Sequence, residues 1–100
     1  MRFYILVFNR KIGASYKAFH DGLVRDPRIR KWWHYLPSSY IIGTDMSAGE
    51  LSRHARAIFD QHKLANTHLV VRVDLDDRQG MLPPKAWKWI RDCAALDDDI

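Results

Sequence analysis

The sequence predicts an α+β domain with an antiparallel sheet, and three observations favour this fold class. Four short segments have the alternation or the β-branched and aromatic enrichment that is typical of strands. Three others repeat apolar residues at helical spacing, with start signals before them. The order strand, helix, strand, strand, helix, strand, helix is that of a ferredoxin-like βαββαβ antiparallel sheet with an additional C-terminal helix.

The first predicted strand covers residues 3–8, FYILVF, which are apolar almost throughout and therefore suit a position buried on both faces. A helix is then expected to run to about Arg25, with Ser15 as its N-cap. Pro27 ends this helix, because the residue before a proline avoids helical angles. The apolar face of the helix is predicted to consist of Tyr16, Phe19 and Leu23.

Two adjacent tryptophans lie in a predicted β-hairpin with strands at 32–36 and 38–44. Because side chains alternate across a strand, Trp32 and Trp33 must point to opposite faces of the sheet. We expect Trp33 to belong to the core. Its expected core partners are Tyr35 and, across the hairpin, Tyr40.

Trp32 and His34 then lie on the open side of the sheet, together with the basic residues that precede them. Trp32 has two alternative roles there. Its ring is either a platform on which a nucleic-acid base stacks or an apolar surface beneath the last helix or in a dimer interface.

The second half of the chain supplies two helices and one strand. Ser47 and Glu50 match the capping box of a helix start, and the last helix is expected to begin at Pro83 and Pro84. The apolar stripe of the first of these helices is predicted to be Leu51, His54, Ala55, Ile58 and Phe59. In a strand over 67–75, the residues expected to face the core are Leu69, Val71, Val73 and Leu75.

Length and composition favour a single ferredoxin-like domain over residues 1–96, including the C-terminal helix, with a frayed acidic tail at 97–100. The chain has 100 residues, a net charge of +4 and one cysteine, Cys93. A lone cysteine favours a reducing compartment, and no apolar run has the roughly 20 residues that span a membrane. We therefore expect a cytoplasmic protein.

Three stretches carry a resemblance to a known family: WWHYL at 32–36, TDMS at 44–47 and MLPPKAWKWI at 81–90. On these motifs the chain resembles the small SinR-like proteins, over almost its whole length. These proteins share the ferredoxin-like fold of the CRISPR-associated adaptation nucleases, to which the similarity is one of fold only. The related nucleases dimerise, and an aspartate at the end of their first strand holds a divalent metal between two subunits.

In this chain the position that matches the nuclease aspartate is Asn9. A neutral amide is a poor ligand for Mg²⁺, which prefers charged oxygen donors, and the neighbouring Arg10 and Lys11 repel a cation. The five histidines show no metal-ligand spacing, and Cys93 has no base placed beside it by the sequence. We assign no catalytic residue, no metal site and no cofactor.

The prediction is a small non-enzymatic nucleic-acid-binding protein of the SinR-like type, which binds DNA or RNA through a basic and aromatic surface and forms a homodimer. The nucleic-acid-binding residues are predicted to be Arg28, Arg30, Lys31, Trp32, His34, Arg53 and Arg56. A first alternative is a protein-interaction module of a phage, CRISPR or toxin–antitoxin system. A second is a divalent-metal-dependent nuclease.

Overall fold

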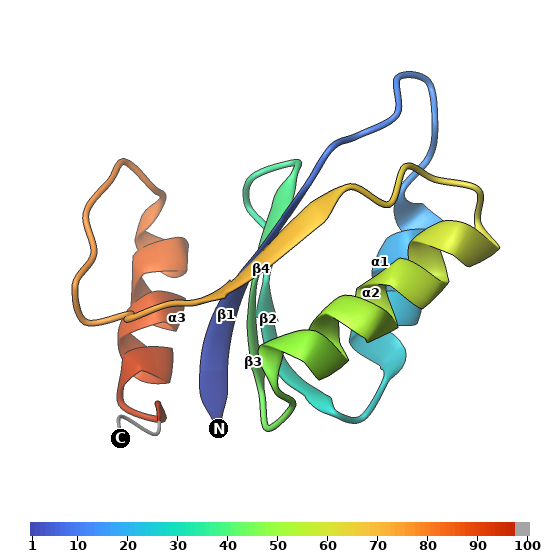
Figure 1. Ribbon diagram of the computed structural model, residues 1–100. Helices are drawn as coiled ribbons and strands as arrows, with labels where there is room; N and C mark the ends of the chain where they lie inside the picture. The colour runs from blue at the N-terminus through green and yellow to red at the C-terminus, as the bar shows by residue number, and fades with distance from the viewer. Residues whose placement is uncertain (98–100) are drawn as a thin grey trace.

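The computed structural model describes residues 1–97, which form one antiparallel sheet of four strands and three helices. The elements in chain order are β1 (Arg2–Phe8), α1 (Lys17–Arg25), β2 (Ile29–Trp33), β3 (Ser39–Thr44), α2 (Ala48–Gln61), β4 (His68–Arg72) and α3 (Pro84–Ala94). The strand order across the sheet is β2-β3-β1-β4. Helices α1 and α2 lie against one face, and α3 lies on the opposite side of the sheet (Figure 1).

The main core fills the space between the sheet and helices α1 and α2. Phe19 of α1 and Phe59 of α2 are fully buried, and their rings stack with centroids 4.2 Å apart. Phe8, from the end of β1, packs against both rings at 5.4 and 5.5 Å. The predicted apolar faces of these two helices are thereby confirmed, because Leu23, Leu51, Ala55 and Ile58 are buried as well.

A second, smaller core lies between α3 and the other sheet face. Phe3 of β1 is fully buried there against Ile90 and Cys93 of α3. Trp89 meets the Phe3 ring edge-on at 6.4 Å, and Trp87 is half-buried in the same cluster. The first strand is therefore covered on both faces near its start, as its continuous apolar run predicts.

The helix starts agree with the sequence prediction in one case and differ in another. At α2 the capping box is complete, since Ser47 Oγ accepts from the backbone N–H of Glu50 and the Glu50 carboxylate accepts from that of Ser47, both at 3.1 Å. At α1 the N-cap is Tyr16 and not Ser15. Ser15 still contributes, because its Oγ accepts from the backbone N–H of Lys17 at 3.3 Å.

The predicted hairpin is present, but its first strand covers different residues from those expected. Strand β2 begins at Ile29 and ends at Trp33, so the expected strand at 32–36 is wrong beyond Trp33. Proline has no N–H with which to continue a ladder, and Pro37 lies in the connection to β3. A register shift between Ile29 and Lys31 marks a bulge in β2.

Trp33 is the buried tryptophan, as predicted, with 6% of its surface exposed against 42% for Trp32. One of its two expected core partners is in contact with it but not buried. The Tyr35 ring lies 5.4 Å from that of Trp33, yet Tyr35 is beyond the strand and 47% exposed, so it is not a core residue. Tyr40 is buried on the opposite face, among the residues that α1 and α2 cover, because the strand register pairs Trp33 with Ile41. Trp32, paired with Ile42, also faces the α1 side and not an open face.

Strand β4 departs most from its predicted burial. The described strand ends at Arg72, and Leu69 and Val71 are 58% and 43% exposed instead of facing the core. Helix α3 covers the residues that follow the strand, so Leu75 is buried, but it does not extend over Leu69. The opposite side of β4 packs on α2, where Val70 is partly buried.

At the C-terminus, the expected frayed tail at 97–100 lies outside the described residues except for Asp97. The Asp97 carboxylate is 3.4 Å from the Arg72 guanidinium, and its side chain is 13% exposed.

Candidate nucleic-acid interface

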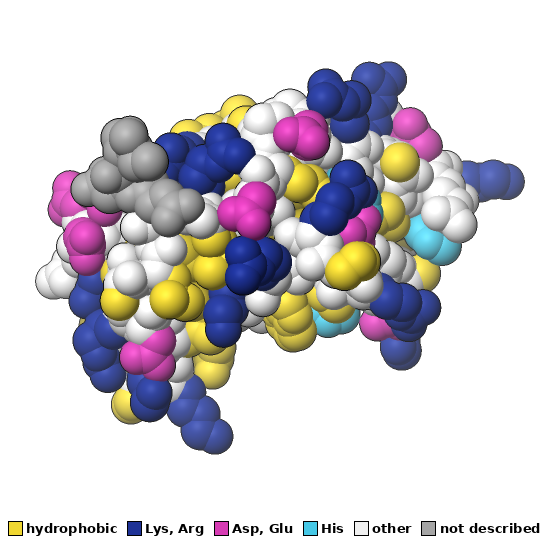
Figure 2. All heavy atoms as spheres, turned by 90° about the horizontal axis from the view of Figure 1, so that it is seen from below, with side chains coloured by type: hydrophobic (Ala, Val, Ile, Leu, Met, Phe, Trp, Pro, Cys, Tyr) yellow, Lys and Arg dark blue, Asp and Glu magenta, His cyan; other side chains and the backbone are white. Residues whose placement is uncertain are grey.

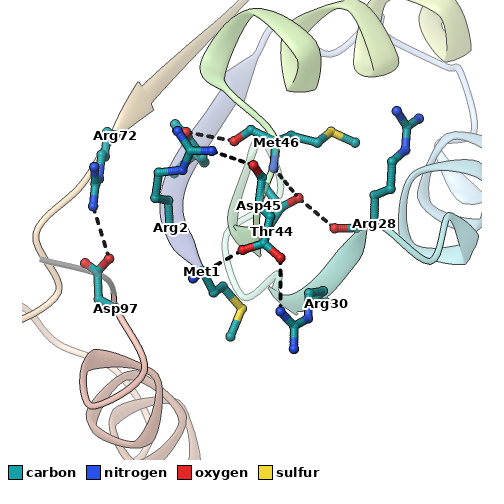
Figure 3. Close-up of polar contacts among 10 residues, drawn as sticks. Met1, Arg2, Arg28, Arg30, Thr44, Asp45, Met46, Arg72 and Asp97 are labelled. Atoms are coloured by element: carbon teal, nitrogen blue, oxygen red, sulfur yellow. Dashed lines mark hydrogen bonds and ion pairs between the residues drawn. The ribbon is translucent and has the colours of Figure 1, made fainter. Parts of the chain in front are cut away.

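Two of the basic residues before the double tryptophan, Arg28 and Arg30, lie near the turn between β3 and α2 (Figure 3). Asp45 is the centre of this junction. Its carboxylate is 3.1 Å from Arg30 Nη1 and 3.2 Å from the Met1 nitrogen, and Arg2 donates to its backbone carbonyl. Segments from β1, β2 and β3 are thus tied to one acidic residue.

Thr44 fixes the same junction from the buried side. Its hydroxyl donates to the Arg28 carbonyl at 2.6 Å and accepts from the Met46 backbone N–H at 3.1 Å. Tyr4 donates to the Met46 carbonyl at 2.9 Å. Because Thr44 is fully buried, these bonds hold the entry to β2 close to the entry to α2.

The Arg28 guanidinium is oriented by Asp26. Arg28 Nε and Nη2 donate to the two oxygens of Asp26 at 3.1 and 2.8 Å, a bidentate geometry. These side-chain bonds, with a backbone bond from Arg28, lower the pKa of Asp26 to about 2. The Arg28 side chain nevertheless remains 56% exposed, so it is positioned at the surface and not buried.

A shallow cavity of about 440 Å³ opens between β2 and the start of α2. It is lined by Pro27, Arg28, Arg30, Thr44, Asp45, Met46 and Glu50. Bonds from Ser47 lower the pKa of Glu50, and the nearby charges of Arg53 and Arg28 lower it further. Arg53, one turn along α2, therefore lies close to this cavity. The junction holds both signs of charge: Arg2, Arg28, Arg30 and Arg53 against Asp26, Asp45 and Glu50.

The remaining predicted site residues lie elsewhere. Lys31 is paired with Gly43, on the face that α3 covers, and its charge acts on Asp92 of that helix. Arg56 is on the outer side of α2, 3.8 Å from Asp60, and lines a different cavity. The structure therefore brings together Arg28, Arg30 and Arg53 and separates them from Lys31 and Arg56.

Trp32 and His34 lie beside α1, in a group of rings that the sequence did not connect. His34 stacks on Tyr40 with centroids 4.0 Å apart, and its Nδ1 is 2.9 Å from the Ser39 carbonyl. His20 of α1 is 2.8 Å from the Tyr40 hydroxyl and meets Trp32 edge-on at 4.8 Å. Burial raises the pKa of Tyr40 to about 12, so this hydroxyl stays protonated.

Basic side chains are spread across the lower face of the molecule, from the α3 end to the end formed by α1 and α2, with acidic side chains between them (Figure 2). Within residues 1–97, neither Lys31 nor Arg53 has an ion-pair partner within 4.0 Å. The positive charge is therefore distributed over a broad surface and not concentrated in one deep pocket.

Sequence reasoning missed two constellations that only the tertiary structure assembles. His20 lies on α1, His34 in the connection after β2, and Tyr40 on β3. Ser52 and His68 are sixteen residues apart, and their side chains lie 2.7 Å from one another. No local spacing motif connects either set, so no pattern in the sequence could have found them.

Asn9 follows β1 at the surface, where its backbone N–H donates to the Thr67 carbonyl at 3.3 Å. Among residues 1–97, no three histidine, cysteine, aspartate or glutamate side chains converge as metal ligands. No helix in this part of the chain is long and apolar enough to cross a membrane. Comparison of the chain with protein-family models, curated proteins and solved structures finds no match.

Proposed function

We propose that this protein binds nucleic acid, without cleaving it, through the surface around the start of α2. The observation that carries the proposal is that Arg28 and Arg30 line one surface cavity at the start of α2, while the charge of Arg53 on that helix acts on Glu50 in the same lining. Phosphate groups are the ligands that guanidinium groups on such a surface recognise best.

The acidic residues of this surface orient the arginines without fully neutralising them. Arg28 and Arg30 are 56% and 54% exposed while paired with Asp26 and Asp45. A guanidinium group has five N–H donors, so donors remain for a phosphate after one carboxylate is bound. The Arg30–Asp45 contact is an exposed ion pair of the weak kind, which leaves it open to exchange with a phosphate backbone.

The test is a titration of fluorescently labelled duplex and single-stranded oligonucleotides, followed by anisotropy from about 50 mM salt upward. For duplex, the logarithm of the binding constant should fall with the logarithm of salt concentration at about −0.9 per phosphate contact. In the double variant Arg30→Gln, Arg53→Gln we expect that slope to become shallower by about 2.

The matched control is Lys17→Gln with Lys85→Gln, which removes the same charge from exposed positions on α1 and α3. This variant should keep the salt slope of the unmodified protein. Equal losses in both variants would show that the net charge and not the α2 surface is responsible. Flat traces at low salt would reject nucleic-acid binding altogether.

We further propose that the sheet belongs to the ferredoxin-like class and that the protein acts in the cytoplasm. The strand order β2-β3-β1-β4, with all neighbours antiparallel and two helices on one face, supports the first proposal. The single cysteine, which is buried, supports the second, because it fits a reducing compartment. The resemblance to SinR-like proteins remains a prediction.

A homodimer is also proposed, with its interface at β4. This strand is the last in the sheet order, and its exposed face carries Leu69 and Val71. Thr67 and Val73 direct their backbone bonds to β1, so Val70 directs its peptide groups outward. Antiparallel pairing with a second copy about Val70 places Leu69 opposite Val71 of that copy, which joins the two apolar patches across a twofold axis.

The variant Leu69→Glu should convert such a dimer into a monomer, because it places carboxylates in the apolar patch. Size-exclusion chromatography with light scattering measures the molar mass directly. The control is Ile12→Glu, which changes the charge equally at a fully exposed residue in the loop before α1. A monomer in the unmodified protein, or the same mass in both variants, would contradict an interface at β4.

A further inference from the structure

A polar constellation between α2 and β4 has the geometry of an activated nucleophile. Ser52 is on α2, and its Oγ lies 2.7 Å from Nε2 of His68 at the start of β4. The other ring nitrogen of His68, Nδ1, is 2.6 Å from the backbone carbonyl of Asn66. Both side chains are half-buried, so the pair is sheltered but remains accessible.

The Asn66 carbonyl determines which nitrogen of His68 has the proton. A carbonyl oxygen only accepts, so the short contact requires a proton on Nδ1. In the neutral ring Nε2 is then an acceptor, and the Ser52 hydroxyl must donate to it. Acyl-transfer sites have this arrangement of nucleophile, base and orienting group. In them a serine donates to a histidine, and an acceptor binds the second nitrogen of that histidine.

The surroundings suit a small anionic substrate. A surface cavity of about 410 Å³ is lined by Ser52, Arg56, Asn66, Thr67 and His68. No carboxylate belongs to this lining. Arg56 follows Ser52 by one helical turn, so both project from the same side of α2, and its contact with Asp60 is a loose 3.8 Å. The Phe59 ring, 5.8 Å from that of His68, forms an apolar support behind the base.

We propose that Ser52 is a nucleophile activated by His68, and that the cavity accepts small carboxylic esters with a negatively charged group. In the first step Ser52 Oγ forms a bond to the ester carbonyl carbon while its proton passes to His68 Nε2. The bond to the leaving alcohol oxygen then breaks, and that oxygen takes the proton from His68. Water attacks the acyl-serine by the same route and releases the acid. Arg56 binds the anionic group of the substrate.

This activity is separate from nucleic-acid binding, and its first test uses a fluorophosphonate probe, which labels activated serines covalently. The full-length protein should be labelled at Ser52, as mass spectrometry of its peptides would show. Ser52→Ala should lose the label, whereas Ser15→Ala should retain it, since Ser15 is an exposed serine before α1 and does not line this cavity. Labelling that survives in Ser52→Ala, or that maps to another residue, overturns the proposal.

The pH dependence of labelling distinguishes a role of His68 as the base from a purely structural role. His68→Gln keeps an acceptor for the Ser52 hydroxyl but cannot take up its proton, and we expect labelling to slow about 100-fold. In the unmodified protein labelling should increase with pH, because only a neutral imidazole accepts the Ser52 proton, and in His68→Gln this dependence should be absent. The charged groups of α2 beside this pair are Arg56 and Asp60. Equal rates and equal pH profiles would overturn the assignment of His68 as the base.

Substrate class is tested by comparing p-nitrophenyl acetate with the mono-p-nitrophenyl ester of succinate. We expect the succinate ester to be hydrolysed at least about 10-fold faster, a factor that corresponds to one charge contact of roughly 1.4 kcal/mol. Arg56→Gln should abolish this preference, while Ser52 is still labelled by the probe. Titration of the same Arg56→Gln variant with oligonucleotide shows whether Arg56 also contributes to nucleic-acid binding, and this separates the two proposals. No preference for the anionic ester would reject the substrate class.

Discussion

Replacement of Phe19 by alanine should lower the free energy of unfolding by about 3–5 kcal/mol. Phe19 is fully buried, and its ring stacks on Phe59 and contacts Phe8 and Tyr40. Its removal leaves a cavity where α1, α2 and the sheet meet, and the neighbouring rings cannot all close the gap. Urea denaturation followed by circular dichroism measures the change.

This loss is a large fraction of the 5–15 kcal/mol that is usual for a domain, so the variant should be partly unfolded at moderate temperature. Ile12→Ala is the control, because Ile12 is fully exposed and its truncation should change stability by no more than about 0.5 kcal/mol. A loss below about 1 kcal/mol for Phe19→Ala would contradict the stacked core between the two helices.

The adjacent tryptophans should respond very differently to the same change. Trp33→Ala is expected to cost about 3–5 kcal/mol, because Trp33 is 94% buried against the α3 side of the sheet. Trp32→Ala should cost about 1 kcal/mol, since its ring is 42% exposed and meets one face of α1 through His20. Denaturation followed by circular dichroism measures the free energy of unfolding of both variants without dependence on tryptophan fluorescence.

Trp33→Phe adds a sharper test. Trp33 Nε1 is a buried donor without an acceptor among the described residues, and such a group costs free energy. Phenylalanine keeps part of the apolar contact and removes this donor, so its cost should be well below that of alanine. Equal losses for the two alanine variants would show that the strand register of β2 differs from Trp33 opposite Ile41.

Sequence patterns predicted the elements of this fold well because each element has a strong local signal. The capping box at Ser47 and the helical spacing of Phe19 and Leu23 require no tertiary information. The errors are at places where long-range packing decides. Tyr35 fits the alternating pattern of a strand, yet β2 has already ended at Trp33. Leu69 fits the alternating pattern of β4, but it lies on a part of the sheet face that α3 does not cover.

The candidate interface was predictable in composition but not in arrangement. The sequence indicated a basic run before the tryptophans, and Arg28 and Arg30 do line a cavity at the start of α2, where the charges of Arg28 and Arg53 both act on Glu50. It could not show the bulge between Ile29 and Lys31, which puts these two residues on opposite faces of the sheet, because a bulge has no unique sequence signature. The pairing of Ser52 with His68 depends on how α2 packs on β4, which local patterns do not encode.

The central position of β1 has a consequence for synthesis of the chain. This strand is made first, but both of its neighbours come later, at residues 39–44 and 68–72. At about 5–20 residues per second, its apolar segment waits for seconds without a partner on either edge. Nascent chains of this protein therefore carry an aggregation-prone strand until β3 emerges, and a chaperone that binds residues 3–8 would have that interval in which to act.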